Sequence, residues 1–340
     1  MIQSLRTLFV LLCCTGLWMI TGCNGHGDDR NSERAAILSR PPFASLTDSL
    51  LQHKSTDEAG LYFRRAELLS RNDQHELAAD DYAKSWELRP DEMTGFRYAS
   101  TLTITGQTGK AIQLLQDCRK KFPANTAFPG MLAELYQQSG KMKNAIGIYD
   151  TMLQTDSLNF EAWYEKGLLL EKNGDTAGAI RALRKAYAIQ PVNTYGLELA
   201  HLYAENRNVI ALSLCDAILK KDSARELLDP FFIKGIYFSN TTQYKKAIVQ
   251  FDSCINRDWK FTDAYLEKGI ALFKQKQYQP ALQSFQMTIK VSEAYPDGYF
   301  WIGRCCEATG KNQEALLYYR QALALDKDFT EAAAGIKRLQ

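Results

Sequence analysis

Histidines and short catalytic motifs are the first place to look for chemistry in this chain, and they do not assemble a reaction centre. The four histidines are His26, His53, His75 and His201. None lies in an HExxH motif or at a Cys/His spacing typical of zinc ligands. The GxSxG, GxxxxGK[ST] and GxGxxG patterns do not occur in it. We therefore expect no enzyme activity, no metal and no cofactor; an enzyme stays open only if residues 24–58 carry chemistry, and they show no motif.

The cysteines divide into a leader group and a later group. Of the eight, three lie near the N-terminus: Cys13, Cys14 and Cys23. The other five are Cys118, Cys215, Cys254, Cys305 and Cys306. An odd number without a CxxC spacing is a poor disulfide framework, and small cysteines at helix-packing positions act as buried apolar side chains. We expect these five to be structural.

The first 22 residues have the features of an export signal. Arg6 precedes an apolar run of about thirteen residues, 8–20. This run is short for a membrane-spanning helix, which needs about 20 residues, and typical of a signal-peptide core. The residues that follow, 20–23 (ITGC), resemble a bacterial lipobox, which implies cleavage before Cys23 and lipidation of its thiol. The alternative is an ordinary secretory signal with an incidental cysteine.

The segment after Cys23 is polar, contains glycine and is weakly patterned. We expect residues 23–44 to form a flexible tether. The acids Asp28 and Asp29 resemble a surface-export signal of Bacteroidetes lipoproteins, the alternative being a solvated linker. Residues 45–58 predict a short helix whose leucines cap the domain that follows.

Overall composition excludes one class of partner. The net charge is +2, from 41 basic and 39 acidic residues. No run of Lys or Arg is long enough to form a basic patch, so nucleic acid is not expected as a partner.

A pattern of small and large residues recurs over most of the chain, and it must position any binding residues. A small residue opens every second expected helix: Ala78, Ala111, Ala145, Ala179, Ala247, Ala281 and Ala315. After a first step of 33 the interval is 34 residues, with one double step. A second small column lies in the expected first helices: Ala66, Ala99, Ala133, Gly167, Ala200, Gly235, Gly269 and Gly303. This pattern resembles the tetratricopeptide repeat, a helix–turn–helix unit of 34 residues.

The resemblance implies an all-α fold, a right-handed superhelical solenoid of about eight repeats. The repeats are expected over residues 59–329, with a C-terminal capping helix over 330–340. The fifth repeat, 193–227, is degenerate. Its turn, 205–208, is expected to have lost about two residues and its glycine.

In tetratricopeptide-repeat arrays the first helices line a concave groove, and the resemblance implies that one set of positions points into it. In the later repeats these positions are mostly apolar, which is typical of a partner site. The expected partner-binding groove comprises Tyr164, Leu168, Leu197, Phe232, Ile236, Leu266, Ile270, Phe273 and Phe300. Acids lie at its edge: Glu161, Asp229, Asp263 and Asp297. The alternative is that the rings pack on the next repeat and that the acids serve as helix starts.

Together these features predict a bacterial cell-envelope lipoprotein, lipid-anchored at Cys23 to the periplasmic or surface face of the outer membrane. It would be a non-catalytic scaffold. Its expected partner is an unknown protein or peptide that is itself an envelope-assembly component. The carboxylate clamp of chaperone-binding relatives is not expected, because the corresponding positions are mostly aromatic, aliphatic or acidic. The alternative function is glycan binding by the groove aromatics.

Overall fold

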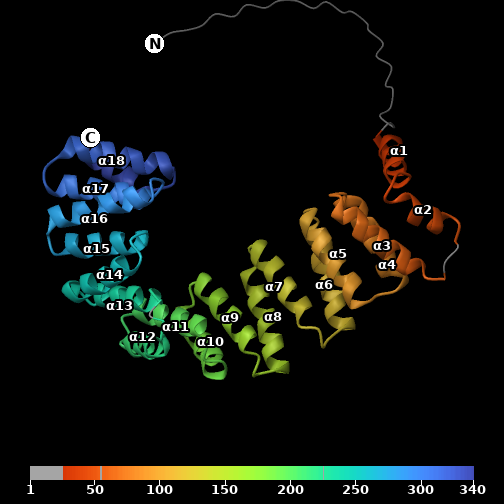
Figure 1. Cartoon of the computed structure of the whole chain (residues 1–340), viewed down its shortest axis with the longest axis horizontal. Coiled ribbons are helices and arrows are strands. Elements are labelled where there is room, and N and C mark those ends of the chain that lie inside the picture. The colour runs from red at the N-terminus through yellow and green to blue at the C-terminus, as the bar shows by residue number, and fades with distance from the viewer. Residues whose placement is uncertain (1–25, 54–55, 225) are drawn as a thin grey trace, which may run out of the picture. The chain divides into compact units, whose positions relative to one another are not determined.

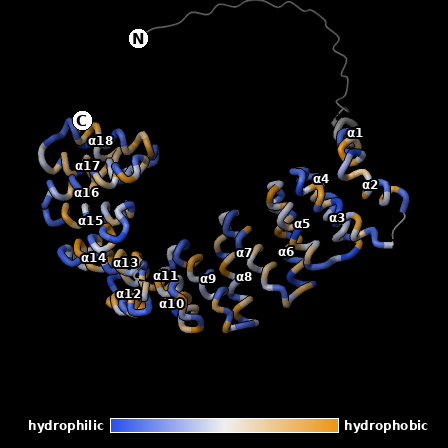
Figure 2. Tube along the Cα trace, viewed as in Figure 1, coloured by the Kyte–Doolittle hydropathy of each residue, from blue (hydrophilic) through white to orange (hydrophobic). Residues whose placement is uncertain are grey.

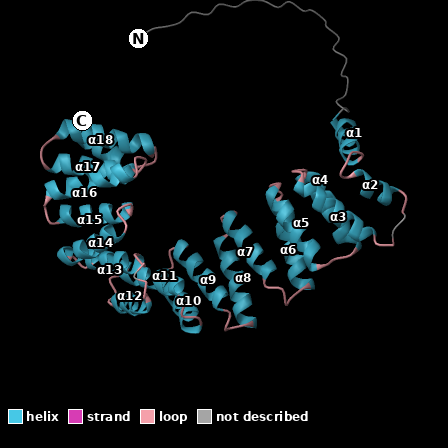
Figure 3. Cartoon of the chain, in the orientation of Figure 1, coloured by secondary structure: helices cyan, strands magenta, loops and turns pink. Residues whose placement is uncertain are grey.

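The structure, a computed structural model, describes residues 26–53, 56–224 and 226–340, and all regular secondary structure in these ranges is helical (Figures 1 and 3). The chain divides into two compact units, residues 1–128 and 129–340. The expected signal segment and Cys23 lie outside the described residues. Within the described ranges, no helix combines the length and apolar character needed to cross a bilayer.

Nineteen helices occupy the described residues. The first six are α1 (His26–Leu38), α2 (Ala44–Leu51), α3 (Glu58–Arg71), α4 (His75–Leu88), α5 (Glu92–Ile104) and α6 (Thr108–Lys121). The next seven are α7 (Ala127–Gln138), α8 (Met142–Thr155), α9 (Phe160–Lys172), α10 (Thr176–Ile189), α11 (Asn193–Glu205), α12 (Ile210–Lys221) and α13 (Asp229–Asn240). The last six are α14 (Tyr244–Arg257), α15 (Thr262–Lys274), α16 (Tyr278–Val291), α17 (Pro296–Ala308), α18 (Asn312–Leu325) and α19 (Thr330–Leu339).

From α3 to α18 the helices form eight helix–turn–helix pairs, and α19 packs against α18 at the end of the chain. Hydrophobic and hydrophilic stretches alternate along the helices (Figure 2), so each helix can bury one side. This is the all-α superhelical repeat fold that the sequence predicts.

The two helices of a pair cross where a small residue of the first, a glycine in four of the pairs, lies under a large side chain of the second. A Cβ atom added to Gly235 or to Gly269 would lie 2.4 Å from the ring of Phe251 or of Phe285. Both rings are fully buried. The small and large columns of the sequence are therefore the two sides of one contact that sets the distance between the paired helices.

Each turn inside a pair contains one residue in the left-handed conformation. In four pairs it is a glycine, at positions 106, 140, 174 and 310, with φ between 70° and 81°. In the other four it is Asp73, Arg207, Thr242 or Lys276, with φ between 57° and 62°. The backbone thus keeps one turn geometry even where the sequence has lost the glycine that suits it.

The fifth pair, α11 and α12, keeps this turn, which differs from the expected shortening. Four residues separate α11 from α12, whereas three separate α9 from α10. One residue is missing between the left-handed residue and the small residue of the second helix. Ala211 follows Arg207 by four residues, whereas Ala179 follows Gly174 by five. Ala211 is still fully buried, so the shift is absorbed by the first turn of α12 and the packing of the pair is preserved.

The N-terminal segment also differs from expectation, because residues 26–38 of the expected flexible tether form helix α1. Leu38 and Phe43, at and just after the end of this helix, are buried in one cluster with Leu69 and Tyr82 of the first repeat. The segment is polar overall, so its few apolar side chains did not indicate a packed helix. Their burial holds the segment against the first repeat.

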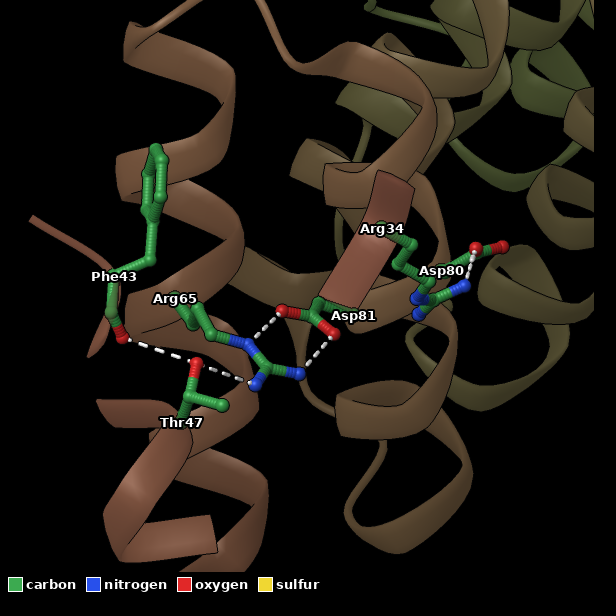
Figure 4. A network of polar contacts seen from close by, with 6 residues as sticks. All are labelled: Arg34, Phe43, Thr47, Arg65, Asp80 and Asp81. Carbon is green, nitrogen blue, oxygen red and sulfur yellow. Dashed lines mark hydrogen bonds and ion pairs between the residues drawn. The ribbon is translucent and has the colours of Figure 1, made fainter. Parts of the chain in front are cut away.

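Polar contacts strengthen this attachment (Figure 4). Arg34 of α1 forms an ion pair with Asp80 of α4. Thr47 of α2 accepts a hydrogen bond from Arg65 Nη1 at 3.1 Å through its Oγ1, and the same hydroxyl donates to the carbonyl of Phe43. Helix α2 begins one residue before the expected N-terminal capping segment, 45–58, ends inside it and contacts α3.

Candidate docking groove

All nine expected groove residues lie on first helices of pairs in the second unit. They are Tyr164 and Leu168 on α9, Leu197 on α11, Phe232 and Ile236 on α13, Leu266, Ile270 and Phe273 on α15, and Phe300 on α17. Successive first helices contact one another, as α11 does α13 and α15 does α17. The structure therefore places these residues along one continuous series of helices.

Two of the nine, Leu266 and Phe300, do not face solvent, which corrects their expected role. They are 8% and 7% exposed and belong to the hydrophobic core of the last repeats. Phe300 contacts the rings of Trp301, Tyr319 and Phe329, with its centroid 5.1 Å from that of Phe329. Both residues stabilise the stack and offer little surface to a partner.

The buried position of Phe300 reflects a contact that the sequence analysis allowed as an alternative. Aromatic residues of the first helices pack on a ring near the start of the next first helix. Tyr164 lies 4.4 Å from Tyr195, and Phe232 lies 5.1 Å from Phe261, between ring centroids. The residues Tyr195, Phe261 and Phe329 were missed as members of this surface. The sequence signal that could have identified them is an aromatic residue near the start of a first helix.

The other seven expected residues are half-buried, and two of them line one hollow between α11 and α13. This hollow has a volume of about 510 Å³, within the usual range of binding pockets. Its lining consists of Thr194, Leu197, Glu198, His201, Asp229, Phe232 and Ile233. It brings Leu197 and Phe232 together and adds Glu198, which the sequence analysis did not single out. A hollow of this size can receive the apolar side chain of another molecule.

Acidic side chains are grouped beside these helices. Burial, aided by the carboxylates of Asp263 and Asp297, raises the pKa of Glu267 to about 7. The pKa of Glu171 is also raised, first by burial and then by the charge of Glu198. The Tyr295 hydroxyl donates a hydrogen bond to Asp263. Carboxylates that raise one another's pKa lie close together, so acidic groups are concentrated along these first helices.

Lysines of the same first helices bind elsewhere. One lysine on each of α9, α13 and α15 pairs with an aspartate on the second helix of the preceding pair: Lys166 with Asp150 at 2.5 Å, Lys234 with Asp216 at 2.7 Å and Lys268 with Asp252 at 2.6 Å. These contacts hold adjacent repeats together. They leave the acids near the hollow without those lysines as counter-charges.

The cysteines offer no reactive centre in the described residues. All five are buried and unpaired. Burial raises the pKa of Cys215 to about 12, so its thiol stays protonated at neutral pH. No group of three or more His, Cys, Asp or Glu in the described part of the chain has the arrangement of a metal site.

Comparisons with known proteins agree with this geometry. Tetratricopeptide-repeat models match residues 131–194, 263–291 and 296–329. The TPR repeat-containing protein YpiA of Bacillus subtilis (strain 168) is 27% identical over 128 residues. These residues are 38% of this chain and 30% of YpiA, so the chain spans about a third of that relative's length.

Solved structures show the same fold. A tetratricopeptide repeat protein from Parabacteroides merdae has a TM-score of 0.61 at 17% identity, covering 72% of this chain and 97% of that one. PilW, a type IV pilus biogenesis factor, has a TM-score of 0.53 at 18% identity, covering 62% of this chain and 98% of that one. The APC/C hetero-tetramer Cut9–Hcn1 has a TM-score of 0.51 at 16% identity, covering 92% and 60%.

Stacked helix pairs with an interlocked glycine–aromatic contact define a protein of the α-helical repeat class. The matched segments make the assignment narrower: the chain contains tetratricopeptide repeats over residues 131–194, 263–291 and 296–329.

Proposed function

We propose that this protein is a non-catalytic scaffold that binds a segment of a partner protein along the first helices of its second unit. The observation that supports this most directly is the hollow between α11 and α13, where Leu197 and Phe232 are only half-buried. Half-buried apolar side chains beside a hollow gain free energy when a partner covers them. Scaffolding by protein contact is the general role of tetratricopeptide repeats.

The docking role is tested by comparing two variants that remove equal kinds of apolar surface. The groove variant carries Leu197→Ser and Phe232→Ser. The control carries Val249→Ser and Leu317→Ser, which are 59% and 55% exposed on second helices α14 and α18. We expect cross-linked pull-down to recover partners with wild type and control and to lose them with the groove variant.

Folding must be measured alongside, because Phe232 also contacts Phe251 and Phe261. Circular dichroism and the unfolding midpoint identify any loss of structure, and the single Leu197→Ser variant then serves as the milder change. Undiminished capture by a folded groove variant would argue against this docking site.

We also propose that the protein is tethered to the bacterial cell envelope through a lipid on Cys23. The support is the leader sequence, with its apolar run and ITGC motif. An envelope-assembly component is the partner we propose, and PilW, which shares the fold, is a type IV pilus biogenesis factor. Cys23→Ser should release the protein from the membrane fraction, and unchanged fractionation would contradict the anchor.

The glycan-binding alternative gains no support from the site. Sugar rings stack on exposed aromatic faces, whereas Phe300 is buried and Phe232 packs between Phe251 and Phe261.

A further inference from the structure

The rim of the hollow between α11 and α13 carries one sign of fixed charge. Its floor is apolar, with Leu197, Phe232 and Ile233, and two carboxylates, Glu198 and Asp229, line it as well. The one other titratable group of the lining is His201. The hollow thus combines an apolar seat with adjacent negative charge.

The negative charge continues along the first helices on both sides of the hollow. Toward α9, the pKa values of Glu165 and Glu171 are raised by burial and then by neighbouring acids. Toward the C-terminus, burial and neighbouring acids likewise raise the pKa values of Glu267 and Asp297. We call the following set the acidic row: Glu161, Glu165, Glu171, Glu198, Asp229, Asp263 and Asp297. Glu267 is left out because its pKa of about 7 leaves it partly protonated at neutral pH.

The protein itself does not neutralise this row. Among the ion pairs of the described residues, none joins a member of the acidic row to a lysine or arginine. On the same helices, Lys166, Lys234 and Lys268 pair with aspartates of the preceding second helices. Arg304 of α17 lies over the rings of Phe273, Phe300 and Trp301. The unmatched charge is therefore concentrated beside the apolar hollow although the whole chain has a net charge of +2.

We propose that the partner segment is positively charged and seats one apolar side chain in the hollow, with lysines or arginines on both sides facing the acidic row. The inference rests on the proposed docking function and specifies its partner. Opposite charge accelerates the encounter and sets the position of the segment, while the apolar side chain supplies the burial. An acidic segment would meet repulsion along the whole row.

Fluorescence anisotropy with synthetic peptides tests this directly on the full chain. The first peptide has a central pair of leucines between runs of lysine. The second replaces the leucines by serines, and the third replaces the lysines by glutamates. We expect the first peptide to bind tightest, with an affinity that falls as salt is added, because exposed charges more than about 10 Å apart are largely screened at 0.1 M salt.

Two protein variants with the same net charge separate a local effect from a general one. Glu198→Gln with Asp229→Asn neutralises the rim of the hollow. Gln313→Lys with Gln321→Lys adds the same charge at exposed positions of α18. We expect the rim variant to bind the leucine–lysine peptide about tenfold more weakly, whereas the α18 variant keeps most of the affinity.

Each outcome has a distinct meaning. Equal binding of the serine–lysine peptide, equal binding by the rim variant, or no binding of the leucine–lysine peptide overturns the inference. If binding of the leucine–glutamate peptide is lost on Leu197→Ser with Phe232→Ser and unaffected by the rim variant, the groove docks a partner of the opposite charge and only the charge assignment fails. If the apolar groove substitutions affect no peptide and no captured partner, the docking function itself fails.

Discussion

Arg65 and Asp81 form a two-point ion pair buried between the two helices of the first repeat. Arg65 Nε lies 2.6 Å from Asp81 Oδ2, and Arg65 Nη2 lies 2.8 Å from Asp81 Oδ1. The residues are 6% and 1% exposed. The remaining guanidinium nitrogen donates to Thr47 of α2, so this pair joins both helices of the repeat to the N-terminal cap (Figure 4).

Removing one partner of this pair should be far more harmful than removing both. Asp81→Ala leaves the Arg65 charge buried without a partner, and we expect it to lower the free energy of unfolding by about 3–5 kcal/mol. Arg65→Met with Asp81→Leu replaces the pair by apolar groups of similar volume and should recover most of that loss. Denaturant unfolding of the variants measures the difference, and equal destabilisation by both would show that the charge is not the cause.

The close contact between Gly269 and Phe285 predicts a position-specific response to alanine. Gly269→Ala places a Cβ atom 2.4 Å from the ring of Phe285 and should destabilise the protein by about 1–3 kcal/mol. Gly147, in the middle of α8, has no neighbouring atom within 4 Å of an added Cβ. Gly147→Ala should therefore stabilise by about 0.5–1 kcal/mol, since alanine favours helix. Thermal unfolding of both variants checks the opposite signs.

The left-handed conformation of Thr242 predicts that glycine is better at this turn. Its φ is 61°, which a β-branched residue adopts only with strain. Thr242→Gly should raise the free energy of unfolding by roughly 0.5–1 kcal/mol, the relief of strain being partly offset by the greater freedom of glycine in the unfolded chain. The matched control, Gln286→Gly within α16, should lower it by about 1 kcal/mol. A lower free energy of unfolding in both variants would show that the Thr242 backbone is not strained.

The raised pKa of Glu267 predicts that stability falls as the pH rises from about 4.5 to about 7. Burial and the charges of Asp263 and Asp297 raise its pKa to about 7 from an ordinary value of 4.5. In this window the unfolded chain has released the proton and the folded chain retains it, so folding is progressively disfavoured until the pH exceeds the folded pKa.

Glu267→Gln removes this titration. At neutral pH the variant should be more stable than wild type by on the order of 1–2 kcal/mol, allowing for screening by solvent at a partly exposed site. Urea unfolding at pH 4.5 and at pH 8 gives the comparison. Parallel pH profiles for wild type and variant would show that folding does not change the pKa of Glu267.

The sequence by itself determined the repeat. The small and large residues represented by Gly235 and Phe251 recur at a fixed interval. Two helices in close contact require that combination. The number of pairs and their helix–turn–helix form therefore followed from the periodicity. The attachment of residues 26–43 did not follow, because Leu38 and Phe43 are isolated apolar residues in a polar segment and only their partners on the first repeat make them core.

Only the tertiary structure decided which groove residues are exposed. Phe232 and Phe300 occupy equivalent positions on α13 and α17, yet Phe232 lines a hollow and Phe300 is buried beside Phe329. The following segment places a ring 5.1 Å from each, Phe261 or Phe329. The difference therefore lies toward the preceding first helix: Phe232 borders the hollow toward α11, whereas Phe300 shares a core cluster with Leu266 of α15. Periodicity records which residues share a helix face, whereas exposure depends on contacts between repeats that the spacing of residues does not contain.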